Sequence, residues 1–367
     1  MHVTSFLLPL VFAALAAAGD PLDVVLRKNN RTLTTFRTLL AVVPELSQNL
    51  TNSIDVTILA PSDDAFAQAM RADPTFAQKA TNASFVADLL SYHVVTGKTM
   101  AASFPEVPRF AHTLLETPSA NLTGTQRVEL VRVGEQARVF SGYKQMSAVT
   151  SPDLSFSGGV LHVVDSVLTF PGTPADTALN TGLTSMAGAL MRAGLFDGIS
   201  ALQAATVFAP TNAAFQAIGA TAAAMEPQDL ARVLEYHVLT NQVRFTPSIT
   251  VTKATHKSQM GEKVTLRKQQ DGTVFANSAK VTISDIITTD GVMHVIDSVL
   301  NPASPKLAPG SPQPAFEGAV STADAPFTDG VKPTINYIPA SSTARSSNVS
   351  LGFAMLGTIG CLAVVYL

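Results

Sequence analysis

Cysteine is nearly absent from this sequence of 367 residues, in which only Cys361 occurs. It lies in an apolar C-terminal tail that we expect to be removed from the mature protein. The mature chain would then have no thiol, which excludes disulfides, thiolate catalysis and cysteine-ligated metal sites. Its domains must be stabilised by their hydrophobic cores alone, and domains of about 130 residues can achieve this.

Aromatic and charged side chains are also scarce. The sequence has no tryptophan and only 5 tyrosines, which disfavours a sugar-binding cleft built on aromatic faces. Charged residues make up 14% of the chain, the formal net charge is -3, and no basic block occurs. Nucleic-acid binding needs a concentrated positive face that displaces counterions. We therefore expect no nucleic-acid partner.

Catalytic signatures are missing from the sequence as well. It contains no G-x-S-x-G nucleophile elbow, no G-x-x-x-x-G-K-[ST] phosphate loop and no G-x-G-x-x-G turn. A zinc site needs three or four suitably spaced ligands, and no H-E-x-x-H motif is present. The paired carboxylates of a glycosidase leave no motif, because their spacing is spatial, and nothing in the sequence points to them. We expect neither enzymatic activity nor a cofactor.

The N-terminus is an apolar run from Phe6 to Ala18 that ends in small residues. This pattern is typical of a cleavable secretory signal peptide over residues 1–18, although the positive region at its start is weak. The alternative is a buried N-terminal helix, which fits an apolar stretch at the extreme terminus poorly. We therefore expect an extracellular protein.

The C-terminus is an uncharged apolar run from Leu351 to Leu367, with no Lys or Arg behind it. As a helix it would span about 26 Å, which is marginal for a bilayer, and membrane helices usually carry a basic cytoplasmic anchor. Small and polar residues precede the run. This order indicates a glycosylphosphatidylinositol (GPI) attachment signal with its tail at 348–367 and attachment at Ser341 or Ser342. A plain membrane helix and a buried helix are the alternatives.

The segment before this tail, residues 302–347, is rich in Pro, Ala, Ser and Thr. Such a composition predicts an extended or disordered stalk that holds the domains away from the membrane. Behind a signal peptide, Asn-X-Ser/Thr triplets are candidate glycosylation sites. They begin at Asn30, Asn49, Asn82 and Asn121, and a further triplet at Asn348 would be lost with the tail.

Three blocks of sequence occur twice and in the same order, which indicates a duplicated domain. The blocks are VTILAPSDDAF (56–66) and ATVFAPTNAAF (205–215), LLSYHVVTG (89–97) and VLEYHVLTN (233–241), and GGVLHVVDSVL (158–168) and DGVMHVIDSVL (290–300).

The first block predicts a buried strand followed by a helix. Its apolar, β-rich start reads as a strand, which Pro61 or Pro210 ends because proline has no amide donor. The Ser-Asp or Thr-Asn pair that follows is a helix-capping signal. Phe66 or Phe215 would then be the first apolar residue of the helix to pack on the strand.

The second and third blocks each place a histidine in a buried element. The second closes an amphipathic helix that ends at His93 or His237. The third, preceded by a turn glycine, alternates in a way that predicts a strand buried on both faces, with His162 or His294 inside it. We expect a long apolar helix over Ser185–Phe196 to cover this sheet.

Two interpretations of these four histidines are open. One is a metal or acid–base site in each domain, and the other is that each imidazole satisfies buried polar groups and joins helix to sheet. We favour the second. Asp165 and Asp297 follow the strand histidines by three residues, which places them on the opposite face, so a dyad within the strand is disfavoured and they should accept backbone amides.

In their order and repetition, these blocks resemble the fasciclin domain family, over residues 20–170 and 174–301. The resemblance implies an α+β fold with two tandem fasciclin-like domains, each a twisted β-sandwich or wedge packed with several helices. Members of that family are typically secreted or held at cell surfaces, serve in adhesion, matrix assembly or cell-wall organisation, and are not generally enzymes. Some animal members present Asp-containing segments to integrins; Glu226–Leu230 loosely resembles one, and we interpret it as a helix start.

The sequence therefore supports a non-enzymatic adhesion protein as the first hypothesis. Its expected partners are cell-surface, matrix or wall components, including further copies of itself, together with the membrane through the lipid anchor. A module that binds a lipid or another hydrophobic ligand between its helices and its sheet is the alternative. A secreted hydrolase that uses His162 or His294 is the third hypothesis and ranks last.

Overall fold

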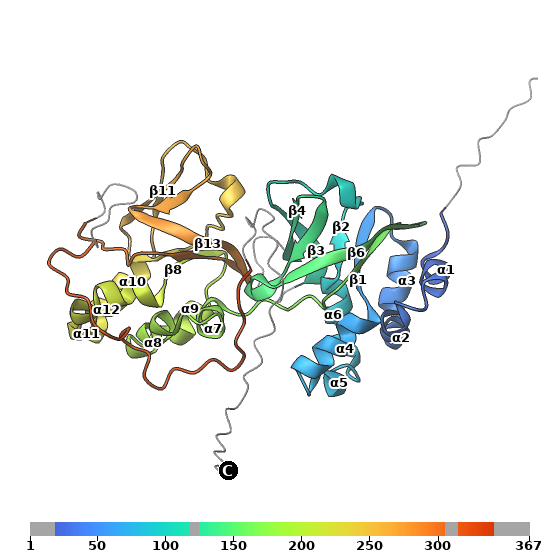
Figure 1. Cartoon of the computed structure of the whole chain (residues 1–367), viewed down its shortest axis with the longest axis horizontal. Coiled ribbons are helices and arrows are strands. Elements are labelled where there is room, and N and C mark those ends of the chain that lie inside the picture. The colour runs from blue at the N-terminus through green and yellow to red at the C-terminus, as the bar shows by residue number, and fades with distance from the viewer. Residues whose placement is uncertain (1–18, 117–124, 305–314, 341–367) are drawn as a thin grey trace, which may run out of the picture.

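The structure, a computed structural model, describes residues 19–116, 125–304 and 315–340. Two lobes lie side by side, and in each of them helices cover a β-sheet (Figure 1). The predicted α+β fold with two tandem domains is therefore confirmed. Within the described ranges, none of the helices has both the length and the apolar character needed to span a bilayer. The predicted signal peptide, Asn121, Ser341, Ser342 and the tail at 348–367 lie outside these ranges.

Domain 1 closes its strands into a barrel in the order β1-β2-β3-β4-β5-β6-β7. Its elements are α1 (Leu22–Lys28), α2 (Thr34–Val42), α3 (Pro44–Asn52), β1 (Val56–Pro61), α4 (Asp63–Ala72), α5 (Phe76–Lys79), α6 (Ala83–Tyr92), β2 (Val94–Thr96), η1 (Ala101–Ser103), β3 (Arg109–Glu116), β4 (Thr125–Val133), β5 (Gln136–Phe140), η2 (Gly142–Lys144), β6 (Met146–Phe156) and β7 (Gly159–Val164).

Domain 2 repeats this plan as an open sheet in the order β10-β11-β12-β13-β14-β8-β9. Its elements are α7 (Pro174–Asn180), α8 (Thr184–Arg192), α9 (Phe196–Ser200), β8 (Ala205–Pro210), α10 (Asn212–Ala217), α11 (Gly219–Ala224), α12 (Pro227–Tyr236), β9 (Val238–Leu239), η3 (Thr246–Ser248), β10 (Ala254–Lys257), β11 (Lys263–Lys268), β12 (Val274–Ala276), β13 (Ala279–Thr288) and β14 (Gly291–Ile296).

The centre of each domain is a parallel pair of strands. β1 pairs with β7 so that Leu59 lies opposite His162, and β8 pairs with β14 so that Phe208 lies opposite His294. Every residue of β1, β7 and β8 is buried, as expected for parallel strands covered on both faces. The strand predictions from the first and third blocks are confirmed.

Each sheet separates two apolar clusters. Helices cover one face, where Phe66 in domain 1 and Phe215 in domain 2 are 1% exposed. On the other face the remaining strands fold over a second cluster that contains Tyr92 or Tyr236. Alternate residues of one strand reach both clusters: Leu161 packs under the helices, whereas Val164 packs on the opposite side.

The capping signal after each proline forms as the sequence predicts. The Ser62 hydroxyl accepts a hydrogen bond from the Ala65 N–H at 3.1 Å, and the Thr211 hydroxyl accepts one from the Ala214 N–H at 3.0 Å. These bonds satisfy one of the free amides at the start of α4 and of α10.

Asp63 and Asn212, which follow Ser62 and Thr211, cap α2 and α8 instead of the helices that they begin. The sequence did not indicate these partners. The Asp63 carboxylate accepts from the Thr34 and Thr35 N–H groups at 3.2 and 2.7 Å, at the start of α2. In domain 2 the Asn212 amide oxygen accepts from the Ser185 N–H of α8 at 3.0 Å. A carboxylate at a helix N-terminus also interacts favourably with the helix dipole. These bonds tie the helix layer to the central strand.

The long helix predicted over Ser185–Phe196 is instead two helices, α8 and α9. Gly194 lies between them with a φ of +67°, the left-handed conformation in which helices commonly end at glycine. The apolar periodicity continued through this glycine, which is why the sequence suggested one helix.

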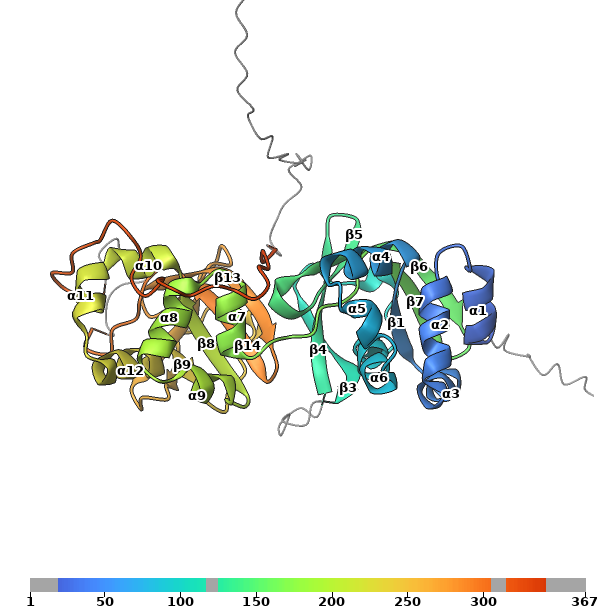
Figure 2. The ribbon, with the colours of Figure 1, turned by 90° about the horizontal axis from the view of Figure 1, so that it is seen from below.

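The predicted stalk also differs from the structure over residues 315–340. This segment has no helix or strand, but it lies along the helices of domain 2 (red in Figures 1 and 2). Phe327 contacts the Phe215 ring edge-on at 6.1 Å, and the Gln216 side chain donates to the Thr322 and Ala323 carbonyls at 3.1 and 2.6 Å. Isolated phenylalanines are therefore enough to dock this Pro-, Ser- and Thr-rich segment on domain 2. We call residues 315–340 the strap.

The glycine before the third block is required by a close backbone approach rather than by a turn. Gly291 is the first residue of β14, opposite Ala205. A Cβ atom built on it would lie 2.0 Å from the Ala205 carbonyl oxygen, and Gly159 meets Val56 in the same way at 1.9 Å. Both contacts are with backbone, which cannot move without breaking the central pairing.

We therefore predict that Gly291→Ala destabilises the protein by about 3 kcal/mol, because β14 must separate from β8. Gly198→Ala in α9 is the matched control, since a Cβ there meets nothing within 4 Å and alanine is the better helix former. The free energy of unfolding from denaturant titration measures both. Equal stability of the two variants would show that the strands tolerate the methyl group.

Candidate functional site

The helix-end histidines connect a helix to the chain that leaves the third block. His93 donates from Nδ1 to the Leu89 carbonyl at 2.7 Å, and its Nε2 accepts from the Leu168 N–H at 2.9 Å. His237 makes the equivalent two bonds at the same distances. Both side chains are fully buried, so each imidazole replaces the water that these backbone groups would otherwise need.

The strand histidines hold a bulge against the opposite side of the sheet. His162 accepts from the Asp153 N–H at 3.0 Å and contacts the Thr99 carbonyl through Nε2 at 2.8 Å. His294 makes the equivalent contacts with Asp285 and Arg244 at 3.2 and 2.8 Å. Both ring nitrogens of each histidine are therefore occupied by backbone groups.

Burial keeps all four imidazoles neutral. Desolvation lowers the pKa of His93 and of His237 to about 4, and it lowers the pKa of His162 and of His294 below the ordinary value. The Asp153 carboxylate lies 3.7 Å from His162 Nδ1, but a neutral ring that already accepts a hydrogen bond there forms no ion pair. These groups are poorly placed to exchange protons with a ligand.

The aspartates of the third block serve backbone groups on the neighbouring strand. Asp165 accepts from the Ala148 N–H and Asp297 from the Lys280 N–H, each at 2.8 Å. Within the described part of the chain, neither carboxylate makes a hydrogen bond to a strand histidine. Across the described ranges, no group of three or more His, Cys, Asp or Glu side chains could hold a metal ion.

A buried ion pair lies where the two domains meet. Lys144 of η2 contacts the Glu129 carboxylate of β4 at 2.5 Å, and their side chains are 1% and 0% exposed. The same ammonium lies 3.4 Å from the Asp285 carbonyl of domain 2 and 5.1 Å from the centre of the Phe140 ring. Lys144 thus connects the barrel of domain 1 to the bulge that His294 holds in domain 2.

The burial of this ion pair disfavours the charged form of Glu129, and Lys144 adopts an unfavourable backbone conformation. Burial raises the pKa of Glu129 to about 7, while the Lys144 ammonium opposes the rise and the Asp285 carboxylate adds to it. Within the described part of the chain, one Glu129 oxygen, Oε1, has no hydrogen-bond partner. Lys144 also has a left-handed φ of +57°, which is costly for a residue with a side chain.

Aromatic stacking completes the junction between the domains. The rings of Phe110 and Phe245 stack with their centroids 3.7 Å apart, and the Arg127 guanidinium lies 5.6 Å from the centre of the Phe245 ring. The Gln126 side chain donates to the Thr289 carbonyl at 2.9 Å. Apolar, cation–π and hydrogen-bonding contacts thus fix the orientation of the two lobes.

The strap ends at this junction and contacts both domains. The Tyr337 ring stacks on Tyr143 of domain 1 at 4.3 Å, while its N–H donates to the Asn180 carbonyl of domain 2 at 2.7 Å. The Ala340 N–H donates to the Lys144 carbonyl at 3.1 Å. The described chain therefore finishes beside the buried lysine.

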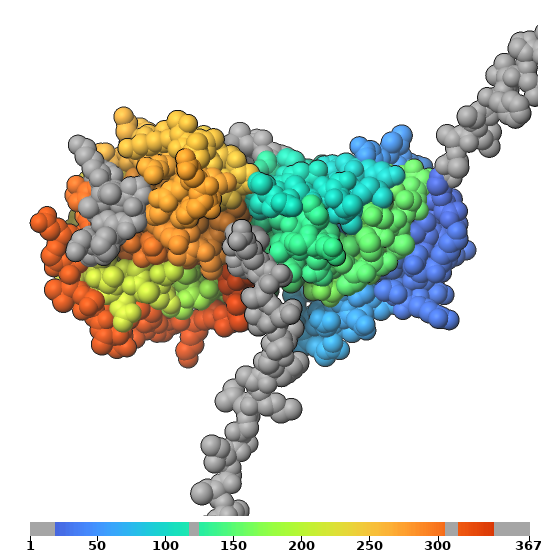
Figure 3. All heavy atoms as spheres, turned by 45° about the horizontal axis from the view of Figure 1, so that its top comes forward, coloured from blue at the N-terminus to red at the C-terminus, as the bar shows by residue number. Residues whose placement is uncertain are grey.

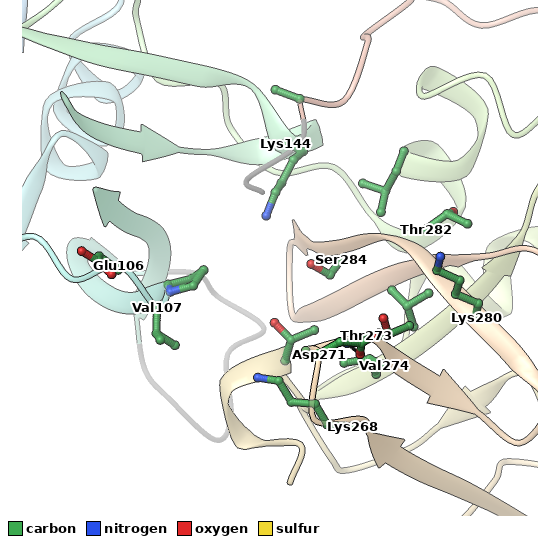
Figure 4. A pocket seen from close by; sticks show the side chains of 16 residues that line it. Glu106, Val107, Lys144, Lys268, Asp271, Thr273, Val274, Lys280, Thr282 and Ser284 are labelled. Carbon is green, nitrogen blue, oxygen red and sulfur yellow. Dashed lines mark hydrogen bonds between the residues drawn. The ribbon is translucent and has the colours of Figure 1, made fainter. Parts of the chain in front are cut away.

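A cleft of about 610 Å³ opens between the domains at this point. Figure 4 shows Lys144 extending toward it from domain 1, with Lys268 and Asp271 on the side of domain 2. Glu106 and Lys280 also line it. Apolar side chains such as Val107, Val281 and Ile283 line it as well, so the cleft presents a mixed polar and apolar surface.

Three of the four candidate glycosylation sites lie in the described ranges, and all three are exposed: Asn30, Asn49 and Asn82. Asn82 caps α6 with its side-chain oxygen, which accepts from the Ser84 N–H at 2.9 Å. A sugar on the side-chain nitrogen would leave that oxygen available.

The sequence did not reveal the junction residues. Lys144 and Glu129 belong to no repeated block, and they meet only because β4, β5 and η2 curl into the barrel. The one available signal was a difference between the copies. The first copy has 23 positions from the end of VFSG (139–142) to Asp165, whereas the second has 20 from the end of VFAN (274–277) to Asp297. Lys144 lies in this longer stretch.

Comparison with known proteins agrees with this architecture of two related domains. The fasciclin domain model matches residues 31–170 and 181–302. A fasciclin-like arabinogalactan protein of Arthroderma benhamiae is 30% identical over 302 residues, which cover 81% of this chain and 71% of that protein. The fasciclin-like arabinogalactan protein elcF of Phaeosphaeria nodorum is 30% identical over 270 residues, covering 73% and 85% of the two chains. The chain belongs to the fasciclin family.

Among solved structures, a FAS1 domain pair from the insect cell adhesion molecule fasciclin I is similar to this chain. It has 17% sequence identity and a TM-score of 0.36, and the match covers 74% of this chain and 98% of that one.

The buried histidines predict a loss of stability in acid. Because the folded-state pKa of His237, about 4, lies below its ordinary value of 6.5, the unfolded chain binds more protons between these two values. The stabilisation is therefore complete above pH 6.5 and decreases as the pH falls toward 4, by about 3 kcal/mol for this imidazole. In His237→Gln, unfolding free energies measured across this range should fall less steeply than in the parent. Parallel curves would mean that the imidazole is not held neutral.

The buried ion pair predicts strong coupling between its partners. Lys144→Met should cost about 3–5 kcal/mol, because Glu129 would stay buried without its partner and would have to remain charged or take up a proton. Adding Glu129→Gln should restore much of the loss. A double-mutant cycle on unfolding free energies gives the coupling, and strictly additive effects of the two substitutions would contradict the pairing.

Proposed function

We propose that this protein is a non-enzymatic adhesion or matrix-interaction protein of the cell surface. Its signal peptide would be removed, and a glycolipid attached at Ser341 or Ser342 would hold it on the outer leaflet, from which it could pass to the wall or matrix. Its partners would be matrix, wall or cell-surface components, including other copies of itself. Membership of the fasciclin family, whose members generally act in adhesion rather than catalysis, carries this proposal.

The state of the histidines supports a structural rather than a catalytic role. Each of the four repeated imidazoles is buried, and both its nitrogens contact backbone groups. A general acid or base must reach the proton that it transfers. The repeated blocks of each domain therefore build the interior and leave recognition to the exposed surface.

The location of the sequons supports exposure to an extracellular environment. Asn30, Asn49 and Asn82 all lie on the surface of domain 1, where oligosaccharides could be attached without disturbing the core. Domain 1 would then be the more heavily glycosylated domain, and contacts with partners would fall mainly on domain 2 and on the junction.

The integrin-like reading of Glu226–Leu230 finds no support. These residues form the start of α12, with Pro227 in its first turn and Leu230 1% exposed in the core. The hydrophobic-ligand alternative also gains no specific support in the described ranges, because the space between helices and sheet is filled by core side chains.

Treatment of intact cells with a phosphatidylinositol-specific phospholipase tests the anchor. The protein should move from the membrane to the medium, and cells that lack its gene should adhere less to their matrix or to one another. A variant with Ser341→Pro and Ser342→Pro, whose small attachment residues are removed, should be absent from the cell surface. Protein that remains membrane-bound after the enzyme, together with unaltered adhesion in the deletion strain, would refute the proposal.

A further inference from the structure

The outer side of the sheet in domain 2 carries a set of exposed cations. In β11, Val264 and Leu266 point into the core, so the residues that alternate with them, Lys263 and Arg267, point outward. We call this side, with its neighbours on β10 and β13, the basic face. Its exposed cations are Lys253, Lys257, Lys263, Arg267 and Lys280.

The strand register brings these cations opposite one another. Lys257 is the direct partner of Lys263 across β10 and β11, and continuing this register by one residue sets Lys253 opposite Arg267. On the next two strands, Arg267 of β11 is the direct partner of Phe275 in β12, and Phe275 is the direct partner of Lys280 in β13. Like charges that face each other across a ladder are destabilising, so the fold carries a repulsion that a polyanion would relieve.

Few acids balance this charge. Residues 244–280 contain seven Lys and Arg residues but only two acids, Glu262 and Asp271, although the whole chain has a net charge of -3. Within the described ranges, no cation of the basic face lies in ion-pair contact with a carboxylate. The concentration arises from strand pairing and not from a run of basic residues, which is why no basic block is visible in the sequence.

The basic face also has a place for a ligand. A shallow depression of about 730 Å³ is lined by Lys253, Arg267 and Lys268, together with Val251, Gln269, Gln270 and Asp271. Thr255 and Thr265 are also direct partners across β10 and β11. They lie between the two pairs of cations, and their hydroxyls can donate hydrogen bonds. Charge and hydrogen-bond donors thus occur together along the two strands.

We propose that the basic face binds an acidic polysaccharide, such as a polymer of uronic acids, in the extracellular matrix or wall. Such a chain offers repeated carboxylates to cations on successive rungs. This inference rests on the proposed extracellular location. It does not conflict with the lack of tryptophan, because recognition would be ionic rather than by stacking on aromatic rings.

Other anionic partners match the basic face less well. Its one aromatic residue, Phe275, is only 5% exposed, so bases of a single-stranded nucleic acid have no ring on which to stack. A membrane surface is usually bound by cations together with inserted aromatic or large apolar side chains. The face presents no exposed aromatic, and Val251 is the one large apolar side chain exposed among the residues that line its depression. A further alternative is that these lysines only prevent the edge strand β10 from pairing with a strand of another molecule. In that case no acidic polymer would bind.

The test uses the full-length protein, extracted in mild detergent, and immobilised polygalacturonate. The parent should bind at low salt, and its affinity should fall steeply as salt is added. The triple variant Lys257→Gln, Lys263→Gln, Arg267→Gln should bind on the order of tenfold more weakly, with a shallower dependence on salt. Its thermal stability should be equal to that of the parent or higher, because facing charges are removed.

The matched control removes three exposed cations from domain 1, in the variant Arg31→Gln, Arg37→Gln, Arg71→Gln, and should bind like the parent. Uncharged dextran and phosphatidylserine vesicles are the comparison ligands. Equal losses in both triple variants, absence of polygalacturonate binding, or binding to the vesicles instead would each overturn the proposal. Phospholipase release and cell adhesion, measured in parallel, would still report on the proposed function if this inference failed.

Discussion

The structure depends on the parallel pairing at the centre of each domain. Parallel strands in a sheet covered on both sides have no access to water, so each neighbouring backbone group must find a partner within the protein. The four repeated histidines supply such partners at the points where regular pairing stops, namely a helix end and a strand bulge. The repeated motifs therefore preserve hydrogen bonding in a dry interior, and the glycine at the start of β7 and of β14 lets the paired backbones approach.

The junction between the domains is governed by a different physical balance. An ion pair such as Lys144–Glu129 loses the hydration of both charges, and a well-packed apolar pair of the same volume would often be at least as stable. Such a pair does, however, penalise arrangements in which its partners separate. Together with the stacked Phe110 and Phe245 rings, it favours one orientation of two domains that could otherwise move independently.

Local order and the central elements could be predicted from the sequence, whereas contacts between distant segments could not. The strand, proline, cap and helix of the first block follow from neighbouring residues, and the strand buried on both faces follows from its alternation. The sequence predicts that Asp63 and Asn212 cap helices, but the helix that each one caps begins far away in the sequence. Lys144 and Asp285 are 141 residues apart and meet only through the docking of the domains. The Pro-, Ser- and Thr-rich composition of the strap predicted disorder and gave no weight to Phe316 and Phe327, the two phenylalanines that pack on the core of domain 2.

The position at which the strap ends has a mechanical consequence. The red surface of the strap reaches the junction between the lobes in Figure 3. Because Ala340 is bonded to Lys144 and Tyr337 lies on Tyr143, tension applied at Ala340 would enter the molecule between the lobes rather than at the far end of domain 2. The first bonds to bear load are the short contacts of Tyr337 and Ala340, and the strap would have to be peeled from α8 and α10 before force reached the strands of domain 2. Residues 315–340 therefore form a reserve of extensible length that can absorb a pull while both domains stay folded.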